Sequence, residues 1–407
     1  MFSKLTEISK EVGSPFYIAH PELFKENLKR FSKAFTQRYP KFILSYSFKT
    51  NYTPFLLKAV LEEGFFAEVV SEIEYELAEL IGFNGKQIIL NGPVKSEALL
   101  KKALYNGSII NLDSNYEIDS LIKLKRQAPD KEISVGLRIN MELNTRNGGS
   151  ALQGGVTESR FGFTEDVLNK IIPMLNDYGI KICALHGHAS TMNHSVENYK
   201  VIANRLVHIG EKYQLNDIAY MDLGGSFFGA APKEVDTSSR PTYDDYAKAV
   251  CDIFLSSKWF TSNNPYIVAE PGASVVTNVF ELATKIFQHK EVNNKHFVSV
   301  DASIFQVRPQ GKTNYPYVEY SNNEPQKEII ADVVGSTCME IDKVAEQIKL
   351  THYSHGDFLV FKASGAYLIN LTPFFINPRC AIVELTPDSY KVIRKRQDAN
   401  HLLSMLQ

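Results

Sequence analysis

Short runs of β-branched and aromatic residues alternate along the chain with longer segments whose apolar residues recur every three or four positions. The short runs predict eight strands, at residues 42–48, 65–70, 87–90, 108–112, 133–139, 181–185, 218–223 and 266–269. The segments between them predict helices at about 52–63, 72–81, 96–105, 115–126, 164–178, 195–213 and 242–257. Such alternation implies parallel strands, and eight units over roughly 240 residues is the size of a closed (β/α)8 TIM barrel. An open doubly wound sheet is the alternative fold.

The pattern is different on either side of this segment. After residue 277, strand-like runs follow one another without long helices, at residues 279–287, 296–300, 328–334, 357–361 and 381–385. Residues 14–20 predict one more strand, and a helical pattern follows it. We therefore predict a barrel domain over residues 25–277 and a C-terminal β-domain over residues 278–407, which the N-terminal segment 1–24 joins.

One connection within the barrel segment is unusually long. Residues 141–160 are rich in asparagine and glycine and contain no clear strand or helix pattern. Loops of this length are uncommon in compact domains unless they have a function. We expect this segment to lie over the mouth of the barrel.

Composition excludes several classes of function. The chain has 407 residues, of which 44% are apolar, and a formal net charge of −2 with dispersed basic residues. No basic face for nucleic acid or for an anionic membrane is visible. The four cysteines have neither a disulfide-framework nor a metal-ligand spacing, and the first 13 residues lack an uninterrupted apolar stretch. These features predict a cytoplasmic protein that binds no metal and acts on a small polar molecule.

Polar residues or glycines follow each of the eight predicted strands. In a barrel, the chemistry lies at the carboxyl ends of the strands. Lys49 follows the first strand, His188 the sixth, Gly224-Gly225 the seventh and Glu270 the eighth. A lysine, a histidine, a carboxylate and a glycine turn at one barrel mouth predict a pyridoxal phosphate site. The lysine would bind the cofactor covalently, and the carboxylate would keep the pyridine nitrogen protonated.

Ordinary structural roles compete with each of these assignments. Most lysines are solvated surface charges. Asp113-Ser114 is equally typical of a helix N-cap, Gly224-Gly225 is compatible with an ordinary turn, and Cys338 would by default be a structural cysteine. The weight of the interpretation therefore rests on the combination of motifs.

That combination resembles the fold-type III pyridoxal phosphate-dependent decarboxylases, which include the diaminopimelate, ornithine, lysine and arginine decarboxylases and share their barrel with the alanine racemases. Tyr46-Ser-Phe-Lys49-Thr-Asn51 is similar to the family's Tyr-x-x-Lys-Ala-Asn, and His188 corresponds to its ring-stacking histidine. Ala269-Glu270-Pro271-Gly272 is similar to the segment whose glutamate pairs with the pyridine nitrogen. The resemblance implies cofactor contacts from Lys49, Glu68, His188, Thr191, Gly224, Gly225, Ser226, Glu270, Gly272 and Tyr367. Among these it implies that Thr191, the glycine run Gly224-Gly225-Ser226 and Tyr367 contact the phosphate.

A second motif lies in the predicted β-domain. Gly335-Ser-Thr-Cys338-Met-Glu340-Ile-Asp342 resembles the family's Gly-Pro-x-Cys-Glu-Ser-x-Asp, whose cysteine and aspartate enter the neighbouring subunit's site. The resemblance implies a homodimer with shared active sites, in which Cys338 acts with Lys49 and His188 in catalysis. It implies substrate contacts from Arg308, Glu340, Asp342 and Tyr367.

The same cysteine bears on the type of reaction. The related racemases use a tyrosine as the second acid–base group, so Cys338 favours decarboxylation over racemisation or epimerisation. A catalytically silent regulatory homologue is the other alternative. Ala273 stands where the family usually has an arginine that contacts the phosphate and, in diaminopimelate decarboxylases, the distal carboxylate. We therefore expect an amino acid with a polar or charged far end, either diaminopimelate-like or modified, to be converted to an amine and CO2.

Overall fold

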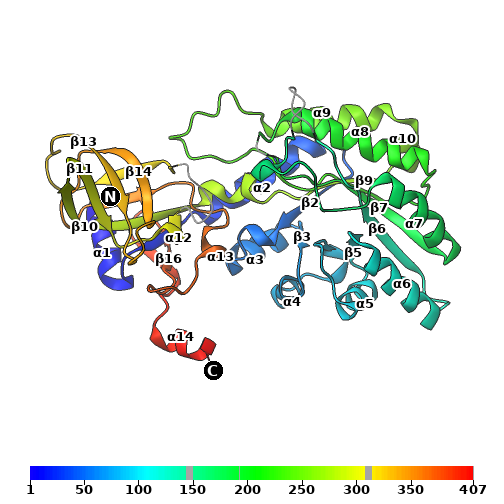
Figure 1. The fold of residues 1–407 in the computed structure, drawn as a ribbon, viewed down its shortest axis with the longest axis horizontal. Helices are drawn as coiled ribbons and strands as arrows, with labels where there is room; N and C mark the ends of the chain where they lie inside the picture. The colour runs from blue at the N-terminus through cyan, green and yellow to red at the C-terminus, as the bar shows by residue number, and fades with distance from the viewer. Residues whose placement is uncertain (144–149, 192, 308–313, 407) are drawn as a thin grey trace. The chain divides into compact units, whose positions relative to one another are not determined.

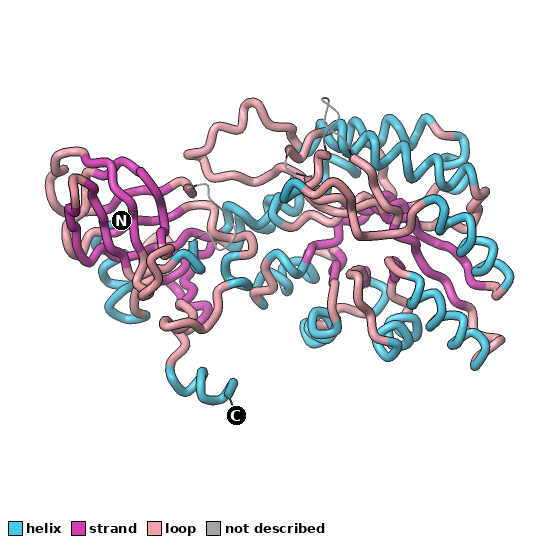
Figure 2. Tube along the Cα trace, in the orientation of Figure 1, coloured by secondary structure: helices cyan, strands magenta, loops and turns pink. Residues whose placement is uncertain are grey.

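The computed structural model describes residues 1–143, 150–191, 193–307 and 314–406. The chain divides into two compact units, one with eight parallel strands and many helices and one dominated by strands (Figures 1 and 2). The barrel unit comprises Lys25–Gly229 and Ser239–Val275. The β unit comprises Met1–Phe24, Ala230–Ser238 and Val276–Gln407.

Eight parallel strands close the barrel in the order of the sequence, which confirms the predicted barrel and excludes the open sheet. The strands are β2 (Phe42–Ser47), β3 (Phe66–Val69), β4 (Ile88–Leu90), β5 (Ile109–Leu112), β6 (Ile133–Arg138), β7 (Ile180–His186), β8 (Tyr220–Asp222) and β9 (Tyr266–Ala269). The ring closes where β9 pairs with β2, with Ile267 opposite Phe42 and Ala269 opposite Leu44.

Helices precede and follow the barrel strands, most of them as the periodicity predicted. They are α2 (Pro21–Thr36), α3 (Pro54–Glu62), α4 (Glu72–Ile81), α5 (Glu97–Asn106), α6 (Asn115–Gln127), α7 (Glu165–Asp177), α8 (Val196–Lys212), α9 (Tyr243–Ser256), α10 (Lys258–Asn263) and α11 (Ala273–Val276). The short helices α10 and α11 were not predicted. In Figure 1 the helices surround the barrel strands.

An apolar layer from four strands packs beneath the polar residues of the barrel. It contains Ile89, Ile109, Ala184 and Val268, with Phe66 and Tyr220 against it. Successive side chains of a strand point to opposite faces, so the residue two positions later lies on the same face, one layer higher. In this barrel those next residues are Glu68, Asn91, Asn111, His186, Asp222 and Glu270.

A buried ion pair joins the loops after β4 and β5. The Lys95 ammonium lies 2.7 Å from Glu117 Oε1 and donates to the carbonyl of Gly92 at 2.6 Å, and both charged side chains are 0% exposed. The other Glu117 oxygen accepts the backbone N–H groups of Asp113 and Ser114, at 2.6 and 2.9 Å. The pair therefore fixes two loops that emerge at the carboxyl end of the barrel.

The β unit is built on one sheet with the strand order β14-β13-β11-β10-β1-β16-β17, and β15 pairs with both β10 and β12. The strands are β1 (Phe16–Ala19), β10 (Phe280–Val292), β11 (Lys295–Val300), β12 (Tyr317–Tyr320), β13 (Ile329–Val334), β14 (Lys343–Leu350), β15 (Phe358–Phe361), β16 (Ala381–Leu385) and β17 (Tyr390–Arg394). The N-terminal strand β1 lies antiparallel to β10 and parallel to β16, so its predicted joining of the β-domain is confirmed.

Four short helices complete the β unit: α1 (Phe2–Val12), α12 (Ile304–Val307), α13 (Leu368–Leu371) and α14 (Ala399–Leu406). Helix α1 was not predicted, and it buries Leu5 and Ile8 against β1 and its neighbours. Strands β12, β14 and β17 were also not predicted. Within the described ranges, no helix has both the length and the apolar character that a membrane span requires.

Candidate active site

Lys49 lies at the carboxyl end of β2, in the short 3-10 turn Phe48–Thr50. The neighbouring Phe48 and Thr50 are buried and anchor the backbone, whereas the Lys49 side chain is 39% exposed. Its ammonium donates to Glu68 Oε2 at 2.8 Å, and Ser47 donates to the same oxygen. The lysine that was predicted to bind a cofactor thus has an accessible amine beside a buried carboxylate.

Two buried carboxylates are linked by an asparagine amide. Asn91 Nδ2 donates to Glu68 Oε1 at 3.1 Å and to Glu270 Oε1 at 2.6 Å. The Asn91 carbonyl oxygen in turn accepts from Asn111 Nδ2 at 2.9 Å. The contacts extend from Lys49 across the barrel mouth to Glu270, so the predicted lysine and carboxylate belong to one network.

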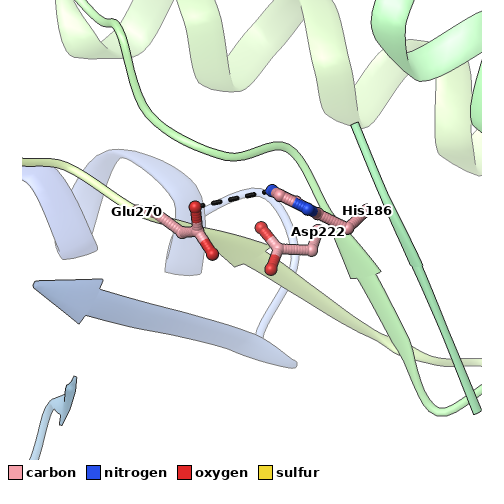
Figure 3. A group of neighbouring side chains, drawn as sticks. All are labelled: His186, Asp222 and Glu270. Carbon is pink, nitrogen blue, oxygen red and sulfur yellow. Dashed lines mark ion pairs between the residues drawn. The ribbon is translucent and has the colours of Figure 1, made fainter. Parts of the chain in front are cut away.

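Glu270 lies close to a histidine and to a second carboxylate (Figure 3). His186 Nε2 lies 3.5 Å from Glu270 Oε2, and one ligand-type atom from each of His186, Asp222 and Glu270 lies within 4.8 Å of the others. Burial and repulsion from Glu270 raise the pKa of Asp222 well above its usual range. Burial alone would also raise the pKa of Glu270, yet attraction to His186 and Lys49 holds it well below its usual range. Glu270 is therefore the ionised member of the pair.

His188 is held as a neutral imidazole beside the glycine turn. Its Nδ1 accepts the N–H of Gly225 at 2.9 Å, so the ring proton resides on Nε2. Burial and the positive charges of Arg138 and Lys49 lower the pKa of His188 well below its usual range. A Cβ on Gly224, at φ +65°, would lie 2.5 Å from the His188 side chain, and glycine alone fits there.

The glycine turn was predicted to offer its amides to a phosphate. In the structure the N–H of Gly224 donates to Asp222 Oδ1 at 2.9 Å, and that of Gly225 donates to His188. These two amides hold the turn against its neighbours. Phosphate contact by the glycine segment stays a prediction.

Thr191 and Ser226, two other predicted phosphate contacts, are brought together. Ser226 Oγ lies 3.5 Å from the backbone nitrogen of Thr191 and 3.0 Å from Nδ1 of His194, which the sequence did not single out. Gly272, another predicted cofactor contact, lies so close to Thr50 that a Cβ there would be 2.1 Å from the threonine oxygen.

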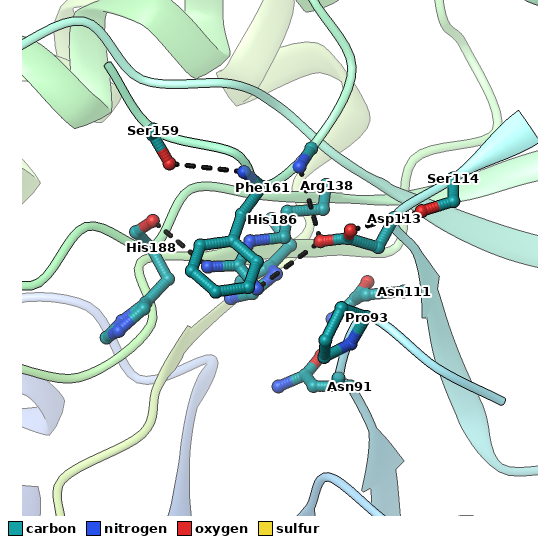
Figure 4. A network of polar contacts seen from close by, with 12 residues as sticks. Asn91, Pro93, Asn111, Asp113, Ser114, Arg138, Ser159, Phe161, His186 and His188 are labelled. Carbon is teal, nitrogen blue, oxygen red and sulfur yellow. Dashed lines mark hydrogen bonds and ion pairs between the residues drawn. The ribbon is translucent and has the colours of Figure 1, made fainter. Parts of the chain in front are cut away.

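An arginine that was not among the predicted site residues lies at the end of β6 (Figure 4). The Arg138 guanidinium is 3.4 Å from Asp113 Oδ1, donates to the carbonyl of His188 at 3.4 Å, and lies 4.6 Å from the centre of the Phe161 ring. Ser114 is the N-cap of α6, whereas Asp113 pairs with this arginine. Asp113 is therefore linked through Arg138 to His188.

The long connection 141–160 was predicted to cover the barrel mouth. Its residues 144–149 lie outside the described residues, and its end is anchored by Asn140, whose side chain donates to the carbonyls of Ser159 and Phe161 at 2.8 Å. Coverage of the mouth by this segment stays a prediction.

The remaining predicted residues belong to the β unit. Cys338 and Glu340 are exposed on the loop Gly335–Asp342, called here the cysteine loop. Asp342 is buried and accepts the N–H of Ile304 at 2.7 Å and both the N–H and the hydroxyl of Thr337, at 2.9 and 2.5 Å. The carboxylate therefore organises its own loop, and its predicted contact with substrate stays a prediction.

Tyr367 and Arg308 are the two other predicted substrate contacts. Tyr367 is partly exposed and has a positive φ of 66° at the start of α13. Arg308 lies outside the described residues.

Sequence reasoning left out Asn91, Asn111, Arg138, His186 and Asp222 from the site. The sequence did contain a signal for them. They lie two positions after inward-facing residues of the barrel strands, so their side chains point to the same inward face. Reading the strands layer by layer would have included them.

Comparisons with known proteins agree with this geometry. Residues 24–277 match the family model described as the pyridoxal binding domain of pyridoxal-dependent decarboxylases. The diaminopimelate decarboxylase of Archaeoglobus fulgidus is 28% identical over 98% of this chain and 94% of its own length. The enzyme of that name from Aquifex aeolicus is 26% identical over 98% of this chain and 93% of its own.

Solved structures show the same fold. A protein of Aquifex aeolicus superposes with a TM-score of 0.84 at 26% identity, covering 99% of this chain and 94% of its own. The diaminopimelate decarboxylase of Helicobacter pylori, complexed with L-lysine, superposes with a TM-score of 0.84 at 22% identity, covering 98% of both chains.

Proposed function

The chain belongs to the family of pyridoxal-dependent decarboxylases, and on that premise we propose that it removes one carboxylate from meso-diaminopimelate to give lysine and CO2. The family match covers the whole barrel, and relatives named diaminopimelate decarboxylase align over nearly the full chain. The observation that carries the proposal is the hydrogen-bonded network that connects Lys49 to the ionised Glu270 at one barrel mouth.

The residues present fit pyridoxal phosphate. An accessible lysine amine lies next to a buried carboxylate, and a second buried carboxylate stays ionised, as pairing with a protonated pyridine nitrogen requires. Lys49, Glu270 and His188 would hold the ring, and Thr191 with Ser226 would contact the phosphate. When bound, the cofactor supplies an electron sink for the pair left at the α-carbon as CO2 departs.

The chain's own residues then divide the work. Glu68 accepts from the Lys49 amine and orients it. The imidazole of His188 is neutral, so its flat face would not repel the positive charge of a protonated pyridine nitrogen. Burial of Glu270 strengthens its attraction to that positive charge, because little water screens it. The barrel mouth thus holds charges in place before the substrate arrives.

Protonation of the α-carbon is assigned to Cys338 of the partner subunit. The thiol is exposed on the cysteine loop, which Asp342 stiffens from inside the β unit. A homodimer with shared sites would bring this loop to a barrel mouth, and the chemistry of a small amino-acid substrate suits a cytoplasmic enzyme. The family motif around Cys338 supports both the role of the thiol and the shared sites.

A second candidate substrate is a modified amino acid with a different far end. Ala273, at the start of α11, takes the place of an arginine that would bind a distal carboxylate in diaminopimelate decarboxylases. Glu340 remains available for a distal ammonium. The substitution favours a substrate whose far end carries an amine next to a neutral or weakly acidic group.

Carbon dioxide release from the cofactor-loaded protein tests the proposal. The substrates are meso-diaminopimelate and both enantiomers of lysine, ornithine and arginine. We expect CO2 and lysine from meso-diaminopimelate. Silence with that substrate, in a protein whose absorbance shows the lysine-bound cofactor, would favour the modified substrate. Inversion of an amino acid's stereocentre without CO2 would replace the proposal with racemisation.

A further inference from the structure

His186 is a buried histidine to which the proposed chemistry assigns no contact with cofactor or substrate. It ends β7, is 1% exposed, and approaches Glu270 at 3.5 Å, which is longer than a good hydrogen bond. Within the described part of the chain, neither of its ring nitrogens has a hydrogen-bond partner. A buried polar group without a partner destabilises the fold, so this position calls for a function.

The surroundings of His186 hold two carboxylates that cannot both be charged at low cost. Asp222 and Glu270 are buried and close together, and such pairs share a proton. Asn91 donates to one oxygen of Glu270, and the Gly224 N–H donates to one oxygen of Asp222. The Asn111 side-chain amide donates to the other oxygen of Asp222 at 3.4 Å. These donors therefore give no preference for ionisation of Glu270 over Asp222.

His186 breaks this balance by its direction. Figure 3 shows an ion-pair contact from the imidazole to Glu270 and none to Asp222. An imidazole nitrogen that carries a proton and faces one carboxylate stabilises the charge on that carboxylate. The ring is also roughly parallel to that of His188, with 14° between the planes and 6.3 Å between the centroids. His188 has its own anchor in Gly225, so loss of His186 would leave His188 in place.

We propose that His186 is a positioning residue that makes Glu270, rather than Asp222, the ionised carboxylate, and so sets how strongly the site holds a protonated pyridine nitrogen. The proposal rests on the cofactor site of the proposed function, but it does not depend on which amino acid is the substrate. It assigns His186 an effect that acts through Glu270 alone.

The first test compares H186L, H186Q and the control H208Q, which changes an exposed histidine of α8. Cofactor affinity of the apoprotein, absorbance of the bound cofactor, kcat, KM and thermal unfolding are measured. We expect H186L to weaken cofactor binding by about tenfold and to lower kcat by a similar factor, as loss of a supporting group does, with KM nearly unchanged. H186Q retains an N–H donor and should recover part of the loss, and H208Q should match the wild type.

The decisive test is a double-mutant cycle between His186 and Glu270. In the E270Q background Glu270 has no charge for His186 to maintain, so H186L should change the cofactor dissociation constant by no more than about twofold. Additive losses, or an H186L protein with wild-type affinity and absorbance, would overturn the proposal. Because affinity and absorbance need no turnover, they decide the role of His186 even if meso-diaminopimelate proves not to be the substrate.

Discussion

The barrel mouth and the cysteine loop solve the placement of reactive groups in opposite ways. At the barrel mouth, Glu68 and Glu270 are buried and each accepts a hydrogen bond from Asn91, whereas the Lys49 side chain is 39% exposed. On the cysteine loop, the buried carboxylate of Asp342 fixes the backbone while Cys338 remains exposed.

The difference follows from what each group must do. A carboxylate that keeps its charge in a dry site needs rigid donors around it, and closely spaced strand ends supply them. A thiol that acts in another subunit needs exposure and a stiff support, which a short loop organised from within supplies. The polar network of the barrel mouth thus lies within one unit, whereas the role proposed for the cysteine loop requires a partner.

Replacement of Lys49 should have the largest effect. K49A removes the amine that we propose binds the cofactor, so we expect CO2 release to fall by at least about 10⁴-fold, which corresponds to roughly 5.5 kcal/mol. Borohydride reduction followed by mass spectrometry should add the cofactor mass to the wild type and to the control K58A, which changes an exposed lysine of α3, but not to K49A. Activity retained by K49A would contradict the assigned role.

Removing one partner of the buried Lys95–Glu117 pair tests whether the barrel mouth depends on internal charge. K95M leaves Glu117 buried and uncompensated, which should lower the free energy of unfolding by about 3–5 kcal/mol. Urea unfolding measures this loss. The control K102M breaks the largely exposed pair with Glu79 and should cost no more than about 1 kcal/mol. Equal losses of unfolding free energy in K95M and K102M would show that the buried pair stabilises the barrel no more than the exposed one.

The carboxyl of Glu74, which accepts the N–H of Val70 after β3, predicts a pH dependence of stability. Burial raises its pKa from 4.5 to about 7. Between these values the folded chain keeps a proton that the unfolded chain loses, so stability falls as pH rises through this window.

E74Q should remove this dependence. Its free energy of unfolding, relative to the wild type, should increase from pH 4.5 to pH 8 by about 3 kcal/mol. Urea unfolding at several pH values gives the difference directly. A difference that is constant with pH would show that Glu74 is not protonated in the folded chain.

Replacement of Cys338 should affect chemistry without affecting the fold. We expect C338A to lower kcat by about 10²-fold, the usual range for loss of an acid–base group, and to leave the melting temperature unchanged because the thiol is exposed. C183A, in barrel strand β7, should retain kcat. A wild-type kcat in C338A would remove the cysteine loop from the mechanism.

The sequence predicted the barrel better than the β unit. All eight barrel strands were predicted, because fully buried parallel strands appear as short apolar runs between helices. Strand β14 was missed because its apolar residues Val344, Ala345, Ile348 and Leu350 are interspersed with charged positions, and β17 follows a turn and is only partly buried. Edge and half-exposed strands carry a weaker pattern.

The site was predicted as separate residues and not as a network. Lys49, Glu68 and Glu270 could be chosen because motifs mark them, but the asparagine that joins them depends on closure of the barrel, which brings β4 and β9 within hydrogen-bonding reach. His186 was passed over in favour of His188 for the same reason. The role of each depends on side chains from distant parts of the sequence.

A heterodimer with K49A in one chain and C338A in the other tests the central claim most directly. If the cysteine loop completes the barrel mouth of the partner, one site of this heterodimer is intact and the other lacks both groups. Purified by two different tags, it should show about half of the wild-type activity per dimer, whereas each parent homodimer is inactive or nearly so. A heterodimer no more active than its parents would contradict the shared site and place Cys338 outside the mechanism or within its own chain.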